Sequence, residues 1–301
     1  MANKKQLSGM LAALTANIIF GFSFIFSKLA LTASHPLIIL CVRFFFAFLT
    51  LNLLLLTGKI KLDFKGKPKK KLLVMGVMQP LLYFILELYG LSLVSSALSG
   101  VIISLVPVAV MLLATLFLKE KTTMIQGVCT AVSIIGVGAI SILSNDNSKT
   151  YFLGVLLLIG AVICASVFNV LSRTESAQFS AFERTYTMFL IGFIGFSLIA
   201  VCVLKNKFIP ELVTAITNPY FIIAILYLSV LSSVAAFILY NYSTSVISVV
   251  QSSSFSNIIT VVTIMAGVIF LRENFSLIEY LLCAVIIAGV WGVNTATPNK
   301  N

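Results

Sequence analysis

Among the charged residues within apolar runs of this sequence, Arg43 in one run and Glu87 in another are the two expected at membrane depth. A charged side chain at the centre of a bilayer costs roughly 2.5–3.5 kcal/mol on insertion scales, so a charge kept there must face a cavity or a partner. Either the two form a salt bridge that fastens two helices, or Glu87 binds a proton, a cation or a substrate. Proton binding requires Glu87 to face a cavity and to separate from Arg43, because burial favours the neutral carboxyl group and a nearby guanidinium favours the charged one.

Uncharged polar and aromatic residues recur in the same apolar runs. Interhelical hydrogen bonds alone can retain such polar groups, and a polar cavity is the other explanation. We expect tyrosine and tryptophan side chains to supply stacking surface, and amide and hydroxyl groups to orient the polar ends of a bound molecule. The candidate cavity residues, besides Glu87, are Asn17, Gln79, Tyr83, Asn169, Tyr240, Gln251, Ser254, Asn257 and Trp291.

No pattern in the chain indicates catalysis, a metal or a cofactor. HExxH, Walker A, GxSxG and paired-aspartate patterns are not found. The five cysteines all fall inside apolar runs, and the single histidine, His35, precedes Pro36 in a short turn. We therefore expect neither an enzyme nor a metal site.

Composition places these residues in a membrane protein. The chain has 301 residues, of which 60% are hydrophobic and 10% charged, and its mean hydropathy is +1.12. A soluble domain is roughly 45–50% apolar, so an aqueous fold would leave much of this surface exposed. The net charge of +11 does not indicate nucleic acid binding, because the basic residues occupy short connections between apolar runs.

Apolar runs long enough to cross a bilayer, about 20 residues each, recur ten times. The sequence thus predicts an all-α polytopic membrane protein of one domain. The ten expected spans are residues 7–30, 36–57, 72–91, 97–118, 124–143, 152–172, 179–204, 220–240, 246–271 and 277–296.

The basic residues predict the orientation. Fourteen of the 20 Lys and Arg residues fall on the side of the termini and of the lysine-rich connection after the second span. The positive-inside rule makes that side cytoplasmic. We expect a cell-membrane protein with both termini in the cytoplasm.

An internal repeat is the most informative feature of the chain. Without gaps, Phe117-Leu118-Lys119-Glu120 aligns with Phe270-Leu271-Arg272-Glu273, and the register extends upstream to pair Phe84-Ile85-Leu86 with Phe237-Ile238-Leu239. Five spans per unit is an odd number, so the second copy crosses the membrane in the opposite sense. Inverted repeats are typical of secondary transporters, which bind substrate near the midplane between the repeats.

The residues from Ser104-Leu105-Val106-Pro107 to Gly136-Val137-Gly138 resemble the signature of the drug/metabolite transporter superfamily, specifically its EamA-type ten-helix exporters. Arg43 and the Phe20-Gly21 pair fit the same pattern. Thr260, at the position matching Pro107, and Lys119 depart from it. The resemblance implies ten helices around a central cavity and export of metabolites, amino acids or drugs.

We therefore expect two inverted five-helix repeats, residues 1–145 and 146–301, around a central cavity. The expected function is export of small molecules by alternating access, with a small-molecule substrate, the lipid bilayer and a proton as partners. A channel and a non-transporting membrane scaffold are the alternatives, and an intramembrane enzyme is a weaker one.

Overall fold

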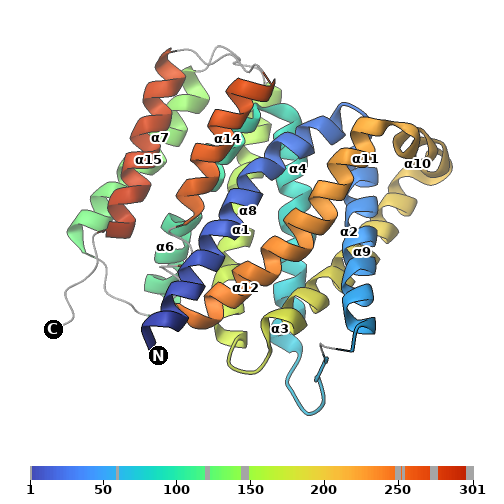
Figure 1. Ribbon diagram of the computed structural model, residues 1–301. Coiled ribbons are helices and arrows are strands. Elements are labelled where there is room, and N and C mark those ends of the chain that lie inside the picture. Colours follow the sequence, from blue (N-terminus) through green and yellow to red (C-terminus); the bar gives the residue numbers. More distant parts are fainter. Residues whose placement is uncertain are drawn as a thin grey trace.

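The computed structural model describes residues 2–58, 61–118, 123–143, 149–247, 252, 255–271 and 277–295, and all regular structure among them is helical (Figure 1). The first half contains α1 (Ala2–Leu31), α2 (Pro36–Leu56), α3 (Lys70–Gly76), the π-helical segment η1 (Val77–Leu82), α4 (Tyr83–Leu93), α5 (Ser96–Ile103), α6 (Val106–Leu118) and α7 (Met124–Leu143). The second half contains α8 (Lys149–Glu175), α9 (Ala181–Leu204), the short turn η2 (Lys205–Lys207), α10 (Phe208–Thr217), α11 (Pro219–Leu226), the π-helical segment η3 (Tyr227–Ala235), α12 (Ala236–Val246), α14 (Ser256–Leu271) and α15 (Leu277–Thr295).

Local capping residues define where several helices begin. Ser180 accepts a hydrogen bond from the backbone N–H of Glu183, and the Glu183 carboxylate accepts one from the Ser180 backbone, which completes a capping box at the start of α9. Ser95 accepts from Leu98 N–H before α5. Such side chains satisfy backbone donors that a helix start leaves free.

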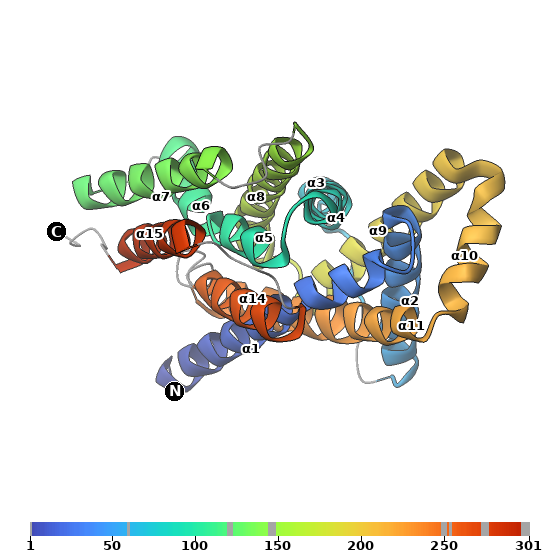
Figure 2. The ribbon, with the colours of Figure 1, turned by 90° about the horizontal axis from the view of Figure 1, so that it is seen from above.

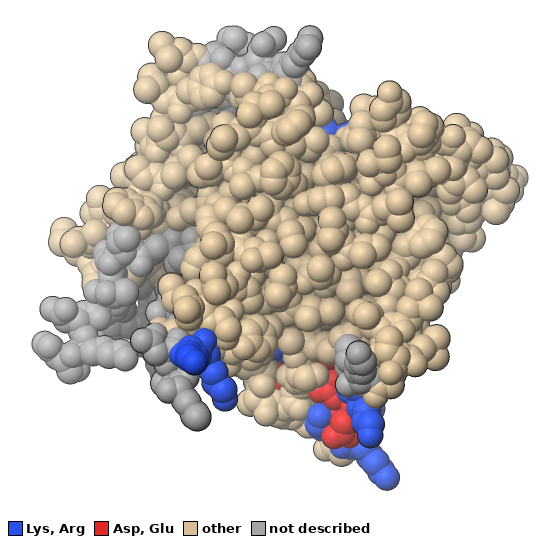
Figure 3. All heavy atoms as spheres, viewed as in Figure 1, with Lys and Arg blue, Asp and Glu red and all other residues tan. Residues whose placement is uncertain are grey.

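Apolar side chains cover the outside of the bundle. Seven helices among the described residues are long and apolar enough to span a membrane, and three further apolar helices are shorter. Figure 3 shows most charged atoms gathered at the end where the N-terminus and the 61–71 connection lie and a small basic patch near the opposite end, whereas the middle of this face carries none. An uncharged belt of this kind suits a bilayer, whose core offers no water to charged groups.

The predicted spans coincide with helices wherever the structure describes their residues; residues 248–251, 253–254 and 296 of the last two spans lie outside the described part. The third, fourth and eighth spans depart from a continuous α-helix, the eighth through the π-helical η3, and one helix was not predicted. Gln79 has non-helical backbone angles (φ −143°, ψ 116°) between α3 and α4, and Ser104 and Leu105 separate α5 from α6. The short amphipathic helix α10 lies between the predicted seventh and eighth spans. It was missed because it has ten residues, whereas a membrane-spanning helix needs about 20 apolar residues.

Helices of the two halves pack against each other in matching pairs. Helix α1 packs on α12 and α14, while α8 packs on α4 and α6. Likewise α2 packs on η3 and α9 packs on η1, and α7 lies along α15 (Figure 2). Because each half covers the interior of the other, residues distant in the chain meet in the middle of the bundle.

A close approach at Gly192 allows α9 to contact both α2 and η1. A Cβ atom at this position would lie 2.6 Å from Phe44 Cδ1 and 2.8 Å from Pro80 Cγ, closer than carbon atoms pack. The absence of a side chain at Gly192 thus brings α9 against the interrupted segment that carries Gln79.

Candidate functional site

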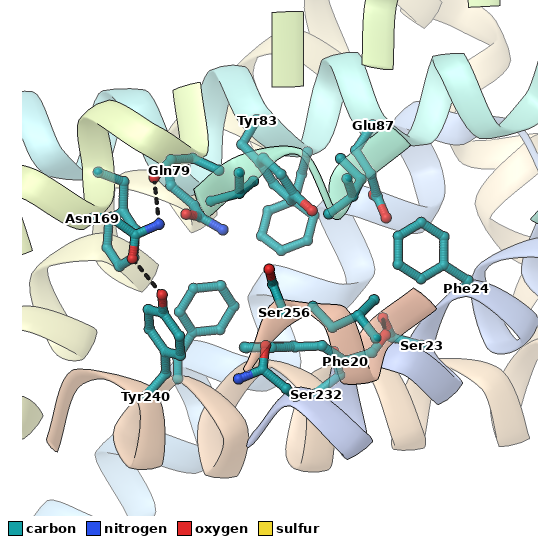
Figure 4. Close-up of a pocket in the computed structure, with 18 of the residues that line it drawn as sticks. Phe20, Ser23, Phe24, Gln79, Tyr83, Glu87, Asn169, Ser232, Tyr240 and Ser256 are labelled. Atoms are coloured by element: carbon teal, nitrogen blue, oxygen red, sulfur yellow. Dashed lines mark hydrogen bonds between the residues drawn. The ribbon is translucent and has the colours of Figure 1, made fainter. Parts of the chain in front are cut away.

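A cavity lies in the middle of the bundle and is lined by residues of both halves (Figure 4). Its volume is about 70 Å³, whereas pockets for drug-sized ligands are roughly 300–1,000 Å³. The cavity must therefore widen to admit a molecule of that size. The polar lining residues are Asn17, Ser23, Arg43, Gln79, Tyr83, Glu87, Asn169, Ser232, Tyr240 and Ser256, and the aromatic ones, besides the two tyrosines, are Phe20, Phe24, Phe84, Phe168 and Phe237.

Two interrupted helices bring polar groups to the cavity. Gln79 lies in η1 and Ser232 in η3, at positions that match in the register aligning Phe117 with Phe270. π-Helical turns often occur at functional sites, and discontinuous helices commonly form transporter binding sites. The repeat therefore places a departure from α-helical geometry on the cavity from each half, a break at Gln79 in η1 and a π-helical segment in η3.

Glu87 points into the cavity from α4 (Figure 4). Its side chain is only 3% exposed, and its Oε2 atom has no hydrogen-bond partner. No ion pair of Glu87 within 4.0 Å is found in the part of the chain that the structure describes. A buried polar oxygen without a donor is costly and rare, so Glu87 is ready to accept a proton or a ligand donor.

Arg43 lies on the same cavity and has other partners. Its Nε donates to Ser233 Oγ at 2.9 Å and its Nη2 donates to Ser232 Oγ at 3.2 Å. The guanidinium carbon lies 4.2 Å from the centre of the Phe84 ring, a cation–π contact. Arg43 and Glu87 therefore share the cavity without a direct salt bridge, which was one of the two alternatives drawn from the sequence, because α2 packs against the hydroxyl groups of η3.

A second polar group lies at the other end of the cavity, where Figure 4 shows Asn169, Gln79 and Tyr240 together. The Tyr240 hydroxyl donates to Asn169 Oδ1, and Asn169 Nδ2 donates to the Ala165 carbonyl at 2.9 Å. Asn17 is also held by its own helix, since its Nδ2 donates to the Ala13 carbonyl at 2.7 Å. These amides are positioned before any ligand binds.

The structure brings together most of the predicted site residues. Those on the cavity are Asn17, Arg43, Gln79, Tyr83, Glu87, Asn169 and Tyr240. Gln251 and Ser254 lie outside the described residues.

Two predicted residues do not line the cavity. Trp291 is 64% exposed on α15, which packs along α7 and away from the interior, and an aromatic ring suits a lipid-facing position there. Asn257 is half-buried, and its neighbour Ser256 faces the cavity instead. One residue is about 100° of rotation on a helix, so the neighbour faces another direction.

Sequence reasoning missed Ser23, Ser232 and Ser256. Serine is common in membrane helices for packing reasons, so its type alone is a weak signal. For Ser232 a signal did exist, because it matches the predicted cavity residue Gln79 in the repeat register.

A further polar cluster surrounds Arg184, which is fully buried near the start of α9. Its Nη1 donates to the Ser172 carbonyl at 2.6 Å, to Ser172 Oγ at 2.7 Å and to Thr244 Oγ1 at 3.2 Å. Its Nη2 donates to the Asn241 carbonyl and to Ser245 Oγ. Arg184 thus ties the end of α8, the start of α9 and the end of α12 together.

The neighbouring Glu183 has different partners from Arg184. Glu183 Oε1 accepts from the backbone N–H of Asp63 at 2.7 Å and lies 3.4 Å from Lys67 Nζ. Glu183 therefore binds the lysine-rich connection, while Arg184 points into the bundle.

The model of the EamA-like transporter family matches this chain twice, over residues 7–142 and 152–295. The chain belongs to the EamA-like transporter family. The two matches confirm the predicted duplication and the predicted resemblance. Together with the apolar helices, they show a multi-pass membrane protein that acts as a transporter.

Two of the following three similar proteins carry transporter names. "Uncharacterized transporter YcxC" of Bacillus subtilis is 32% identical over 100% of this chain and 97% of its own length. "Uncharacterized transporter YetK" of the same organism is 25% identical over 96% of this chain and 87% of its own length. "Protein PagO" of Salmonella typhimurium is 24% identical over 58% of each chain. The family match and the two transporter names point to a transporter rather than an enzyme.

One solved crystal structure has the same fold. It superposes with a TM-score of 0.68, covering 96% of this chain and 97% of its own, at 16% sequence identity. At this identity the similarity shows the fold alone.

Proposed function

We propose that this EamA-like protein is a secondary transporter that exports small amphipathic metabolites, amino acids or drugs by alternating access. The proposal includes ten membrane-spanning helices in two inverted five-helix repeats, residues 1–145 and 146–301. The observation that supports it best is the central cavity, which both halves line and which interrupted helices border at matching positions.

The cavity chemistry supports an amphipathic substrate. Seven aromatic rings offer apolar surface, while the amides of Asn17, Gln79 and Asn169 offer fixed polar contacts. Glu87 is the proposed proton-binding residue, because its carboxylate is buried on the cavity and is not tied to Arg43. A carboxyl group in such surroundings can alternate between the neutral and the charged form as the cavity opens and closes.

Counterflow in proteoliposomes tests the transporter proposal. With a panel of labelled amino acids, amines and small aromatic metabolites, the wild-type protein is expected to exchange at least one solute with saturable kinetics, and Asn169→Ala is expected to weaken that exchange. Asn52→Ala is the matched control. Asn52 also donates to its own helix, at Phe48 O, and accepts from a tyrosine hydroxyl, that of Tyr186, but it does not line the cavity.

Unsaturable flux would favour a channel, and the absence of flux for every solute would favour a scaffold. Equal exchange in Asn169→Ala and Asn52→Ala would show that the cavity is not the substrate site.

The proposed orientation places the lysine-rich connection in the cytoplasm. A cysteine in place of the exposed Lys65, in a chain whose five native cysteines are replaced by alanine, is expected to resist an impermeant maleimide in intact cells and to react after permeabilisation. Thr214→Cys, exposed on α10 at the opposite end of the bundle, should react in intact cells. The reverse labelling pattern would overturn the orientation.

A further inference from the structure

The charged groups of the cavity differ in what they can still bind. Arg43 directs N–H groups to Ser232 and Ser233 and stacks on Phe84. Glu87 Oε2, by contrast, is buried and accepts no hydrogen bond. Glu87 therefore lacks a hydrogen-bond donor, whereas the guanidinium of Arg43 is already held in place.

A second orphaned oxygen lies on the same cavity. Ser256 Oγ is buried without a hydrogen-bond partner, and Figure 4 shows it on the side of the cavity that faces Glu87. An ionised carboxylate only accepts hydrogen bonds, and a hydroxyl can accept as well as donate. One group that satisfies both oxygens is an ammonium, which carries several N–H donors and no acceptor.

Aromatic rings border this end of the cavity. Figure 4 places Phe24 beside Glu87, and Phe20 and Tyr83 also line the cavity. Ring faces attract cations by roughly 0.5–2 kcal/mol, more when water is excluded. The remaining aromatic lining, including Phe168 and Phe237, suits an apolar body behind the cationic group.

We propose that the substrate class is an amphipathic organic cation, a protonated amine on a small apolar or aromatic body, with its ammonium on Glu87 and Ser256. This inference rests on the transporter function proposed above and names the substrate class for the same cavity. The polar end formed by Asn169, Tyr240 and Gln79 would meet the far end of the molecule.

Exchange of a proton for a cation on Glu87 leaves the charge of the cavity unchanged. With Glu87 protonated, Arg43 leaves the empty cavity with one positive charge; with Glu87 ionised and an ammonium bound, the total is again one positive charge. A proton and an amine can therefore replace each other on Glu87 without changing the charge that the bundle must bury. Among the described residues, the other titratable side chains around Glu87 and Tyr83 are Arg43 on α2 and Cys164 on α8.

Competition binding to the purified full-length protein tests the inference. The labelled probe is tritiated 2-phenylethylamine, and the competitors share its ring: phenylalanine as zwitterion, 3-phenylpropionate as anion and 2-phenylethanol as neutral molecule. The unlabelled amine is expected to compete at least tenfold better than each of the other three.

Variants locate the binding group. Glu87→Gln is expected to weaken binding of the amine at least tenfold, and Glu87→Asp is expected to keep part of it because the charge remains. Glu211→Gln is the control, since Glu211 Oε2 is also buried without a partner but lies on α10, outside the central cavity. It should bind as the wild type does.

Better competition by phenylalanine or 3-phenylpropionate than by the amine would overturn the inference, as would unchanged binding in Glu87→Gln. If none of the four compounds binds while counterflow of another solute is saturable, the substrate class is wrong and the transporter proposal stands. The ranking of the four compounds is measured on the wild-type protein. It therefore tests the inference even if Glu87→Gln fails to fold.

Discussion

Glu87→Gln is expected to remove pH-gradient-driven accumulation of substrate in proteoliposomes. A gradient of one pH unit supplies about 1.4 kcal/mol per proton, enough for about tenfold accumulation if one proton moves per cycle. Glutamine cannot exchange a proton, so the variant should exchange substrate slowly toward equal concentrations and no further. The measurement is labelled substrate inside the vesicles with and without the gradient.

The geometry around Glu87 separates this role from a structural one. A salt bridge to Arg43 would make Glu87→Gln unstable, and neutralising Arg43 would rescue it. Arg43 is held by Ser232, Ser233 and Phe84 instead. Thermal unfolding in detergent should therefore be nearly unchanged in Glu87→Gln, with no rescue by Arg43→Gln.

Glu211→Gln is the control for the coupling experiment as well and should accumulate substrate like the wild type. Gradient-driven accumulation that persists in Glu87→Gln would remove this residue from the mechanism, and facilitated diffusion would then be the better description.

Arg184→Ala is expected to destabilise the protein by at least about 3 kcal/mol, because one or two hydrogen bonds from a charged donor contribute that much and Arg184 makes five. The substitution also leaves a buried space where the largest fully buried side chain stood. The expected readout is a large fall in the thermal unfolding temperature in detergent or loss of folded protein from the membrane.

Arg173→Ala is the matched control for Arg184→Ala. Arg173 also binds α12, but within the part of the chain that the structure describes it makes one hydrogen bond, from Nη1 to the Thr244 carbonyl at 2.7 Å, at a partly exposed site. A smaller loss of stability is therefore expected. Equal effects of the two substitutions would contradict the view that the buried network around Arg184 holds α8, α9 and α12 together.

Local sequence determined the class of this protein and much of its helix layout. Among the described residues, apolar runs of membrane-spanning length correctly predicted helices, because a backbone in a bilayer must satisfy its hydrogen bonds internally. The ungapped match of Phe117 with Phe270 predicted the duplication that the family comparison confirms. The cost of burying polar groups in an apolar run also singled out Gln79, Glu87 and Asn169, which all line the cavity.

Tertiary structure decided which of these groups meet. The sequence identifies Arg43 and Glu87 as charged residues in apolar runs, but it does not show their partners. The packing of α2 on η3 gives Arg43 its hydroxyl partners and leaves Glu87 Oε2 without a hydrogen bond. The exposure of Trp291 and the burial of Arg184 depend in the same way on which helix faces are turned inward. A run of apolar residues on all sides of a helix carries little information about its rotation or its neighbours, since lipid and protein interior are both apolar. Those choices come from contacts between residues far apart in the chain.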